Sequence, residues 1–117
     1  MIDEEKFEKF NNKIITAEVE LLNMNEELNT LMVEKRTIEE NVMKIVFDDK
    51  NFSNEAKRKI EKNIRLKDHD YYKKLLEQEG KLSYDIKVKN IEHSGLSRNF
   101  SFMKALCYKE GGLSDGK

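Results

Sequence analysis

The chain has 117 residues, of which 38% are charged and 38% apolar, and its formal net charge is −1. Its length suits one domain, and its single cysteine, Cys107, excludes an internal disulfide and an all-cysteine metal site. Proline, which removes a helix hydrogen bond, is absent, so the composition favours long uninterrupted helices. We therefore expect an all-α protein with a single helical domain over residues 1–110 and a flexible tail over residues 111–117.

The first half of the chain carries a heptad pattern, in which apolar residues recur at alternate spacings of three and four. Lys35 is the one polar residue at these positions, where it would set the register of the pair, extend its ammonium to solvent or mark a binding site. The pattern predicts a first helix over about residues 3–47 that presents one stripe to a partner helix. The seam positions are Phe7, Phe10, Ile14, Ala17, Leu21, Met24, Leu28, Leu31, Lys35, Ile38, Val42 and Ile45.

A corner follows at residues 48–53, where "DDKNFS" is rich in residues that favour turns. Ser53 is the expected N-cap of the second helix, with Asn51 as a weaker alternative. We expect that helix over about residues 54–93, with Gly80 inside it. Its predicted apolar stripe is less regular and consists of Ala56, Ile60, Ile64, Tyr71, Leu75, Leu82, Ile86, Val88 and Ile91.

The segment "HSGLS" at residues 93–97 predicts the next break, with Gly95 ending the second helix and Ser97 capping a third over about residues 97–109. The third segment is apolar almost all round, so it would pack on the hairpin, join an oligomer or hold a partner. The fold expected is a long antiparallel two-helix coiled-coil hairpin with a short third C-terminal helix. A lone hairpin buries one stripe per helix, which favours a homodimer. The candidate oligomer or partner surface is Phe100, Phe102, Met103 and Leu106.

The charges are unevenly distributed, because residues 1–50 carry 13 acidic and 7 basic side chains and residues 51–117 carry 10 and 15. The basic run that opens the second helix could pair with acidic residues of the first helix (Glu34, Glu39, Glu40, Asp48 and Asp49), with nucleic-acid phosphates, or with an acidic protein. For the nucleic-acid alternative, Tyr71 and Tyr72 could stack on unpaired bases. The candidate binding residues are Lys57, Arg58, Lys62, Arg65, Lys67 and Tyr72.

Motifs that carry chemistry are scarce in this sequence. There is no Gly-rich phosphate loop, HExxH motif, CxxC pair or GxSxG elbow. The one dense titratable cluster, "KDHDYY" at residues 67–72, would lie on a helix whose neighbouring side chains point about 100° apart and cannot converge on a metal. We therefore expect no enzyme activity, no cofactor and no metal site.

The heptad helix, the corner "DDKNFSNEAKRK" and the segments "YYKKLLEQEGKLSYDIKVKNIEH" and "FSFMKAL" together resemble the small helical-hairpin proteins of early gene cassettes in bacteriophages and prophages. Residues 48–107 carry most of the likeness. Genes of this kind often lie near recombination and single-strand-binding genes. The resemblance implies a non-catalytic accessory protein that acts on nucleic-acid machinery or on host defence, as small anti-CRISPR proteins do.

These observations leave three hypotheses. The preferred one is a phage-type protein that binds another protein, such as a CRISPR–Cas or other nuclease complex, as its inhibitor or accessory. In that case the acidic face of the first helix could enter a basic nucleic-acid channel of the partner. The alternatives are direct nucleic-acid binding and a purely structural coiled-coil oligomer. The charged start "MIDEEKFEKF" and the lack of long apolar runs predict a cytoplasmic protein without membrane contact. The acidic face comprises Asp3, Glu4, Glu5, Glu8, Glu18 and Glu20.

Overall fold

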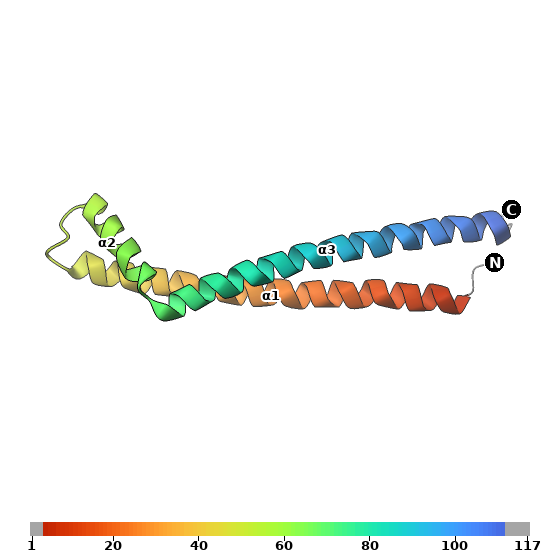
Figure 1. Cartoon of the computed structure of the whole chain (residues 1–117), viewed down its shortest axis with the longest axis horizontal. Helices are drawn as coiled ribbons and strands as arrows, with labels where there is room; N and C mark the ends of the chain where they lie inside the picture. Colours follow the sequence, from red (N-terminus) through yellow and green to blue (C-terminus); the bar gives the residue numbers. More distant parts are fainter. Residues whose placement is uncertain (1–3, 112–117) are drawn as a thin grey trace. The chain divides into compact units, whose positions relative to one another are not determined.

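The computed structural model describes residues 4–111, and this part of the chain forms three helices and no strand (Figure 1). Helix α1 spans Glu4–Asp48, α2 spans Glu55–Lys67 and α3 spans Asp70–Gly111. The described residues are all-α, with two long helices and one shorter helix, which confirms the predicted fold class. The first helix lies within a residue of its predicted bounds. Residues 112–117, most of the predicted tail, lie outside the described residues.

The short helix is the second and not the C-terminal one, so the predicted order of the helices is wrong. The helix expected over residues 54–93 ends at Lys67, and a new helix begins at Asp70. The break expected at residues 93–97 is absent, and the predicted third helix over residues 97–109 is part of α3. Gly95 stays helical because Leu96 and Phe100 continue the packed face of α3, which outweighs the modest cost of glycine inside a helix.

The junction between α2 and α3 consists of Asp68 and His69. The Asp68 amide donates to the Ile64 carbonyl at 3.2 Å and the His69 amide donates to the Leu66 carbonyl at 3.1 Å, which closes α2. His69 then opens α3, because its Nδ1 accepts from the Tyr72 amide at 3.0 Å. Within the segment "KDHDYY" one helix therefore ends and the next begins. It is not the continuous helix face that its charges suggested.

The corner between α1 and α2 lies at residues 49–54, close to its predicted place. Asn54 is the N-cap of α2, and its Oδ1 accepts from the Lys57 amide at 2.8 Å, so the expectation of Ser53 or Asn51 as the cap is wrong. Asn54 has extended backbone angles and stands three residues before Lys57, which is the cap geometry that aspartate, asparagine and serine share.

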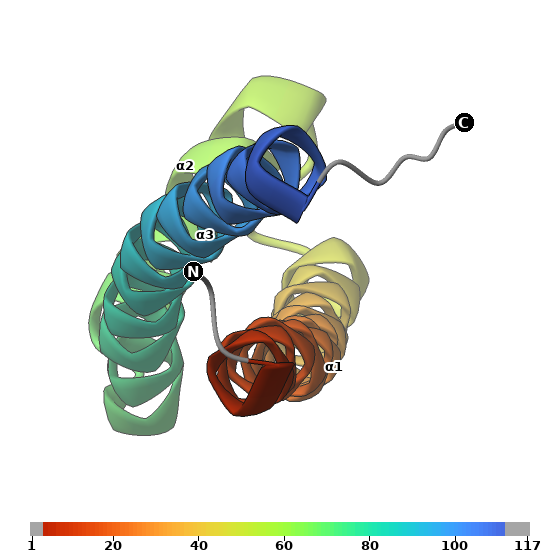
Figure 2. The same ribbon diagram turned by 90° about the vertical axis from the view of Figure 1, so that its right-hand side faces the viewer.

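The contacts divide the chain into two compact units. Among the described residues, unit 1 contains residues 4–24 and 85–111, and unit 2 contains Asn25–Tyr84. Within unit 1 the segments of α1 and α3 lie side by side, as the two ends of the colour scale show in Figure 2. They run antiparallel, because Phe7 packs on Phe100 whereas Glu18, further along α1, pairs with His93, which lies earlier on α3.

Unit 2 contains the end of α1, the whole of α2 and the start of α3. Its core joins all three, because Val42 and Val46 of α1 pack with Leu66 of α2 and Tyr72 of α3. Ile38 and Phe52 lie against this cluster. The α1 and α3 segments are antiparallel here too, since Lys35 contacts Glu79 and Glu39 contacts Tyr72.

The predicted seam of α1 is confirmed from Phe7 to Val42, since every one of these positions is buried or half-buried. At its end the prediction is wrong, because Ile45 is 59% exposed and Val46 is fully buried. A helix with 3.6 residues per turn drifts from a strict heptad, and α2 packs against this end of α1 from a new direction.

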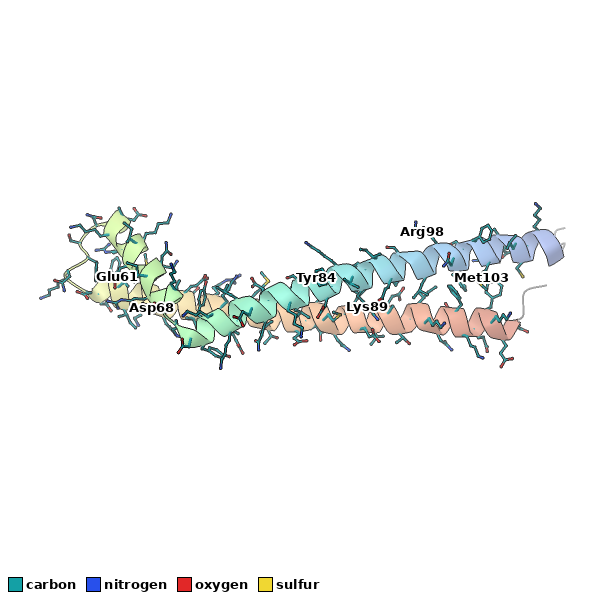
Figure 3. All side chains as sticks on the ribbon, viewed as in Figure 1. Glu61, Asp68, Tyr84, Lys89, Arg98 and Met103 are labelled. Atoms are coloured by element: carbon teal, nitrogen blue, oxygen red, sulfur yellow. The ribbon has the colours of Figure 1, made fainter. Side chains whose placement is uncertain are left out.

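The seam of α3 follows a strict heptad that begins at Tyr72 and includes three polar residues. The apolar stripe predicted for the second helix therefore holds at Leu75, Leu82 and Ile86 and is wrong elsewhere, since the break at Asp68 resets the phase. In unit 1, Lys89 and Met103 point toward α1 and Arg98 points away (Figure 3). The buried or half-buried positions are Tyr72, Leu75, Glu79, Leu82, Ile86, Lys89, His93, Leu96, Phe100 and Met103.

Candidate interaction surfaces

The two arginines of the basic run are turned inward and hold the corner of unit 2. Arg58 donates from Nε to the Phe52 carbonyl at 2.9 Å, and its guanidinium lies 4.3 Å from the centroid of the Phe47 ring. Arg65 pairs with Glu61 at 2.9 Å and with Asp49 at 3.8 Å. These contacts leave the arginines little freedom to bind phosphate.

The lysines of the same run behave differently, because Lys57, Lys62 and Lys67 form no ion pair within the described residues. Lys57 and Lys67 are exposed and Lys62 is half-buried. Of the five acidic residues on and beside the end of α1 that were expected to neutralise the run, Asp49 alone does so, through Arg65.

Two of the other acids bind tyrosines instead. Glu34 accepts from the Tyr71 hydroxyl at 2.8 Å, and Glu39 accepts from the Tyr72 hydroxyl at 2.6 Å. Burial and the carboxylate of Glu39 raise the pKa of Tyr72 to about 12. Tyr72 is only 9% exposed, so its ring belongs to the core and is not available to stack on a base.

The outward side of α2 is apolar at its centre. Ile60 is 61% exposed and Ile64 is 50% exposed, although the sequence predicted both at the seam. Lys57 and Lys67 lie one turn before and one turn after them on the same helix face. We name Lys57, Ile60, Ile64 and Lys67 the α2 outer face. Leu66, 6% exposed, is the residue that anchors this helix to the core.

The acidic residues of α1 fall into two groups. Glu4, Glu5 and Glu8 are exposed on the first turns of the helix, and Asp3 lies outside the described residues. Glu18 pairs with His93 at 3.1 Å. Glu20 pairs with Lys89, and this hydrogen bond raises the pKa of Lys89. The predicted acidic face is therefore partly engaged within unit 1.

The candidate apolar surface at the end of α3 is largely used inside unit 1. The Phe100 ring lies 5.4 Å from the Phe7 ring in an edge-to-face arrangement and 6.4 Å from the Phe10 ring in a stacked one. Met103 and Leu106 are half-buried. Phe102, 65% exposed, is the member of this set that faces solvent.

Unit 1 also contains an open groove of about 470 Å³ beside Ala17. It exists because Ala17 is small, so its seam position leaves space that a larger side chain would fill. Lysines of both helices line it, and Ala17 and Leu96 are its apolar lining residues. The lining residues are Lys9, Asn12, Lys13, Thr16, Ala17, Lys89, Glu92 and Leu96.

Sequence reasoning missed the α2 outer face and the groove. The first was missed because the sequence was interpreted as one helix over residues 54–93, and the break at Asp68 and His69 separates the phase of α2 from that of α3. The signal for the second was alanine at a seam position. Within residues 4–111, no three histidine, cysteine or acidic side chains gather as metal ligands would. No described helix has the length and apolar character needed to cross a bilayer.

Comparison with protein-family models, with curated proteins and with solved structures finds no match for this chain. The resemblance to phage helical-hairpin proteins therefore stays a prediction.

Proposed function

We propose that this chain is a non-enzymatic binding protein that acts by contact with another protein, as a phage-type inhibitor or accessory of a nucleic-acid-processing complex such as a CRISPR–Cas or other nuclease assembly. The single observation that carries the proposal is the α2 outer face, where two isoleucines lie exposed between two lysines that form no ion pair with any described residue. The class of partner comes from the phage-type resemblance.

The chemistry of this face fits a protein better than a nucleic acid. Burying a full isoleucine side chain stabilises a complex by about 1.5–3 kcal/mol, and a phosphate backbone offers no apolar surface to bury it against. Lys57 and Lys67 at the two ends favour a partner with carboxylates around an apolar centre.

The face is also held in place before binding. Leu66 anchors α2 in the core of unit 2, while Arg58 and Arg65 fix it to the corner through the Phe52 carbonyl and Asp49. A partner therefore meets a surface that is already ordered, which reduces the entropy lost on binding.

A pull-down from nuclease-treated lysate of the bacterial host tests the proposal. We expect the tagged chain to retain one specific partner, and the double variant I60S/I64S to lose it. The matched control is V88S/I91S, which removes two exposed apolar residues of α3 and should retain the partner. Both variants change exposed positions, so their stability should stay within about 0.5 kcal/mol of the parent.

Equal recovery by the parent and I60S/I64S, or no specific partner, would refute the proposal. A stable oligomer that captures nothing would favour a structural coiled coil.

Direct nucleic-acid binding is the second candidate, because Lys57, Lys62 and Lys67 form no ion pair within residues 4–111. It predicts retardation of single- or double-stranded DNA that weakens as salt rises. In the triple variant K57Q/K62Q/K67Q, the slope of log affinity against log salt concentration should become less steep by the amount expected for roughly three lost phosphate contacts. Absence of any shift at low salt would remove this candidate.

A further inference from the structure

Along the groove of unit 1, the charges of α1 change from basic to acidic. An antiparallel copy of the same helix would therefore face them with opposite charges. Four side chains of α1 follow one another on the same helix face at spacings of four, three and four: Lys9, Lys13, Thr16 and Glu20. Lys9, Lys13 and Thr16 line the groove, and Glu20 pairs with Lys89, which lines it from α3. The two lysines therefore lie on the N-terminal side of Thr16, and the glutamate lies on its C-terminal side.

From this pattern we infer that the groove is the binding site for a second copy of the chain, whose α1 lies antiparallel to the first across a two-fold axis near Thr16 and Ala17. Reversal of direction then places Lys13 of each copy beside Glu20 of the other. A two-fold contact uses the same patch on both subunits, which this arrangement provides.

The centre of the contact is where close approach is possible. Ala17 is only 3% exposed and contributes one methyl group to the groove lining, so it lies beneath the contact and leaves room above it for the helix of a second copy. Thr16 is small too, and Leu96 of α3 adds an apolar floor. Small residues at a helix crossing permit short distances between axes, and leucine beside them supplies apolar area to bury.

The charges favour a second copy over other occupants. Lys9 and Lys13 form no ion pair within the described residues, so they are available for carboxylates. Glu92, which lines the groove, and Glu20, which pairs with the lining residue Lys89, would repel a phosphate backbone. The contact differs from the predicted dimer surface at the end of α3, where Phe100 packs on Phe7 and Phe10.

Exchange of charges between two variants tests the inference. In K13E, residue 13 of each copy meets Glu20 of the other, and in E20K residue 20 meets Lys13. Each variant alone should therefore dimerise at least about tenfold more weakly than the parent in sedimentation equilibrium. An equal mixture of the two should recover the dimer, since every pair across the axis is again of opposite charge. The control is K104E, an exposed lysine of α3 outside the groove, which should dimerise like the parent.

A cysteine cross-link gives an independent readout if a charge variant fails to fold. In a C107S background, T16C should form an intermolecular disulfide under mild oxidation, because the axis brings residue 16 close to its counterpart. N12C should not, since antiparallel packing separates the two copies of residue 12 by roughly 13 Å along the helix, beyond disulfide reach.

A parent chain that stays monomeric at its highest soluble concentration would overturn the inference, as would a dimer whose stability K13E and E20K leave unchanged. DNA binding that K13E abolishes in a monomeric chain would assign the groove to nucleic acid instead. These outcomes do not depend on the α2 outer face, so they neither support nor contradict the proposed function.

Discussion

Lys35 and Glu79 are polar residues at seam positions of α1 and α3, and they meet each other inside unit 2. The Lys35 ammonium lies 3.1 Å from Oε1 and 3.0 Å from Oε2 of Glu79, and both side chains are 24% exposed. A polar pair in an apolar seam stabilises one register, because any shift along the helix would leave both groups facing apolar residues.

We therefore predict that removing one partner costs more than removing both. K35A leaves the Glu79 carboxylate partly buried without its cation and should lower the free energy of unfolding by about 1–3 kcal/mol. The double variant K35M/E79L should regain most of that stability. Urea unfolding of the two variants measures the difference, and K35T/T37K, which moves the lysine to an exposed position, is a control that should resemble K35A. If K35A had the same free energy of unfolding as the parent, the ion pair would contribute nothing to stability.

Tyr72 gives the protein a dependence on alkaline pH. Its pKa is raised from 10.0 to about 12 in the folded chain, so between these values the unfolded chain loses a proton that the folded chain keeps. The contribution of Tyr72 is thus complete below pH 10 and is lost as the pH rises through 12. We predict that the free energy of unfolding falls more steeply between pH 9.5 and 11.5 in the parent than in Y72F. Equal slopes would contradict the role of Tyr72, and Y108F, at an exposed position of α3, is the control.

The sequence singled out Lys35 without its partner Glu79, and it gave Tyr72 and Glu39 roles other than the hydrogen bond between them. Lys35 stood out as the exception in a regular heptad, and register, solvent exposure and a binding site were the alternatives that it left open. Glu79 could not be chosen as its partner, because the phase of α3 depends on the break at Asp68 and His69. The same unknown phase placed Tyr72 among surface residues that could stack on bases.

Helix α1 could be predicted almost completely, since its periodicity extends over many turns and its end coincides with turn-forming residues. The α2–α3 junction could not, because Asp, His and Asp are tolerated on an exposed helix face and signal a break only when their hydrogen bonds are known. Glycine was the misleading signal. Gly95 looked like a helix end, yet the apolar residues after it pack on α1 and keep the helix continuous.

His69 determines where α3 begins, so its cap can be tested. Its Nδ1 accepts from the Tyr72 amide at 3.0 Å, which fixes Tyr72 at the first seam position of α3. H69A removes the acceptor and should lower the free energy of unfolding by about 1 kcal/mol, whereas H69N should retain most of the stability because asparagine is a good N-cap. Thermal unfolding followed by circular dichroism measures both. If H69A and H69N were equally destabilised, the cap would not be the reason.

The buried residues are unevenly divided between the two units of the molecule. Unit 2 contains Val42, Val46, Leu66, Tyr72 and Leu75, whereas Ile14, Ala17 and Ile86 are the buried residues of unit 1 within the described part of the chain. Three helices contribute to unit 2 and two to unit 1. The fold class followed from periodicity alone, but this division did not, because it depends on α2 folding onto the end of α1.

Hydrogen exchange should reveal the division as a difference in local stability. Amides in unit 2 should exchange more slowly than those in unit 1, since opening unit 2 exposes a larger apolar core. V46A, which truncates a fully buried side chain, should accelerate exchange across residues 25–84 more than across residues 4–24 and 85–111. I86A is the matched change in unit 1 and should do the reverse. Equal acceleration of the whole chain by both variants would show instead that residues 1–110 unfold as the single cooperative domain predicted from the sequence, because one opening would then expose both cores.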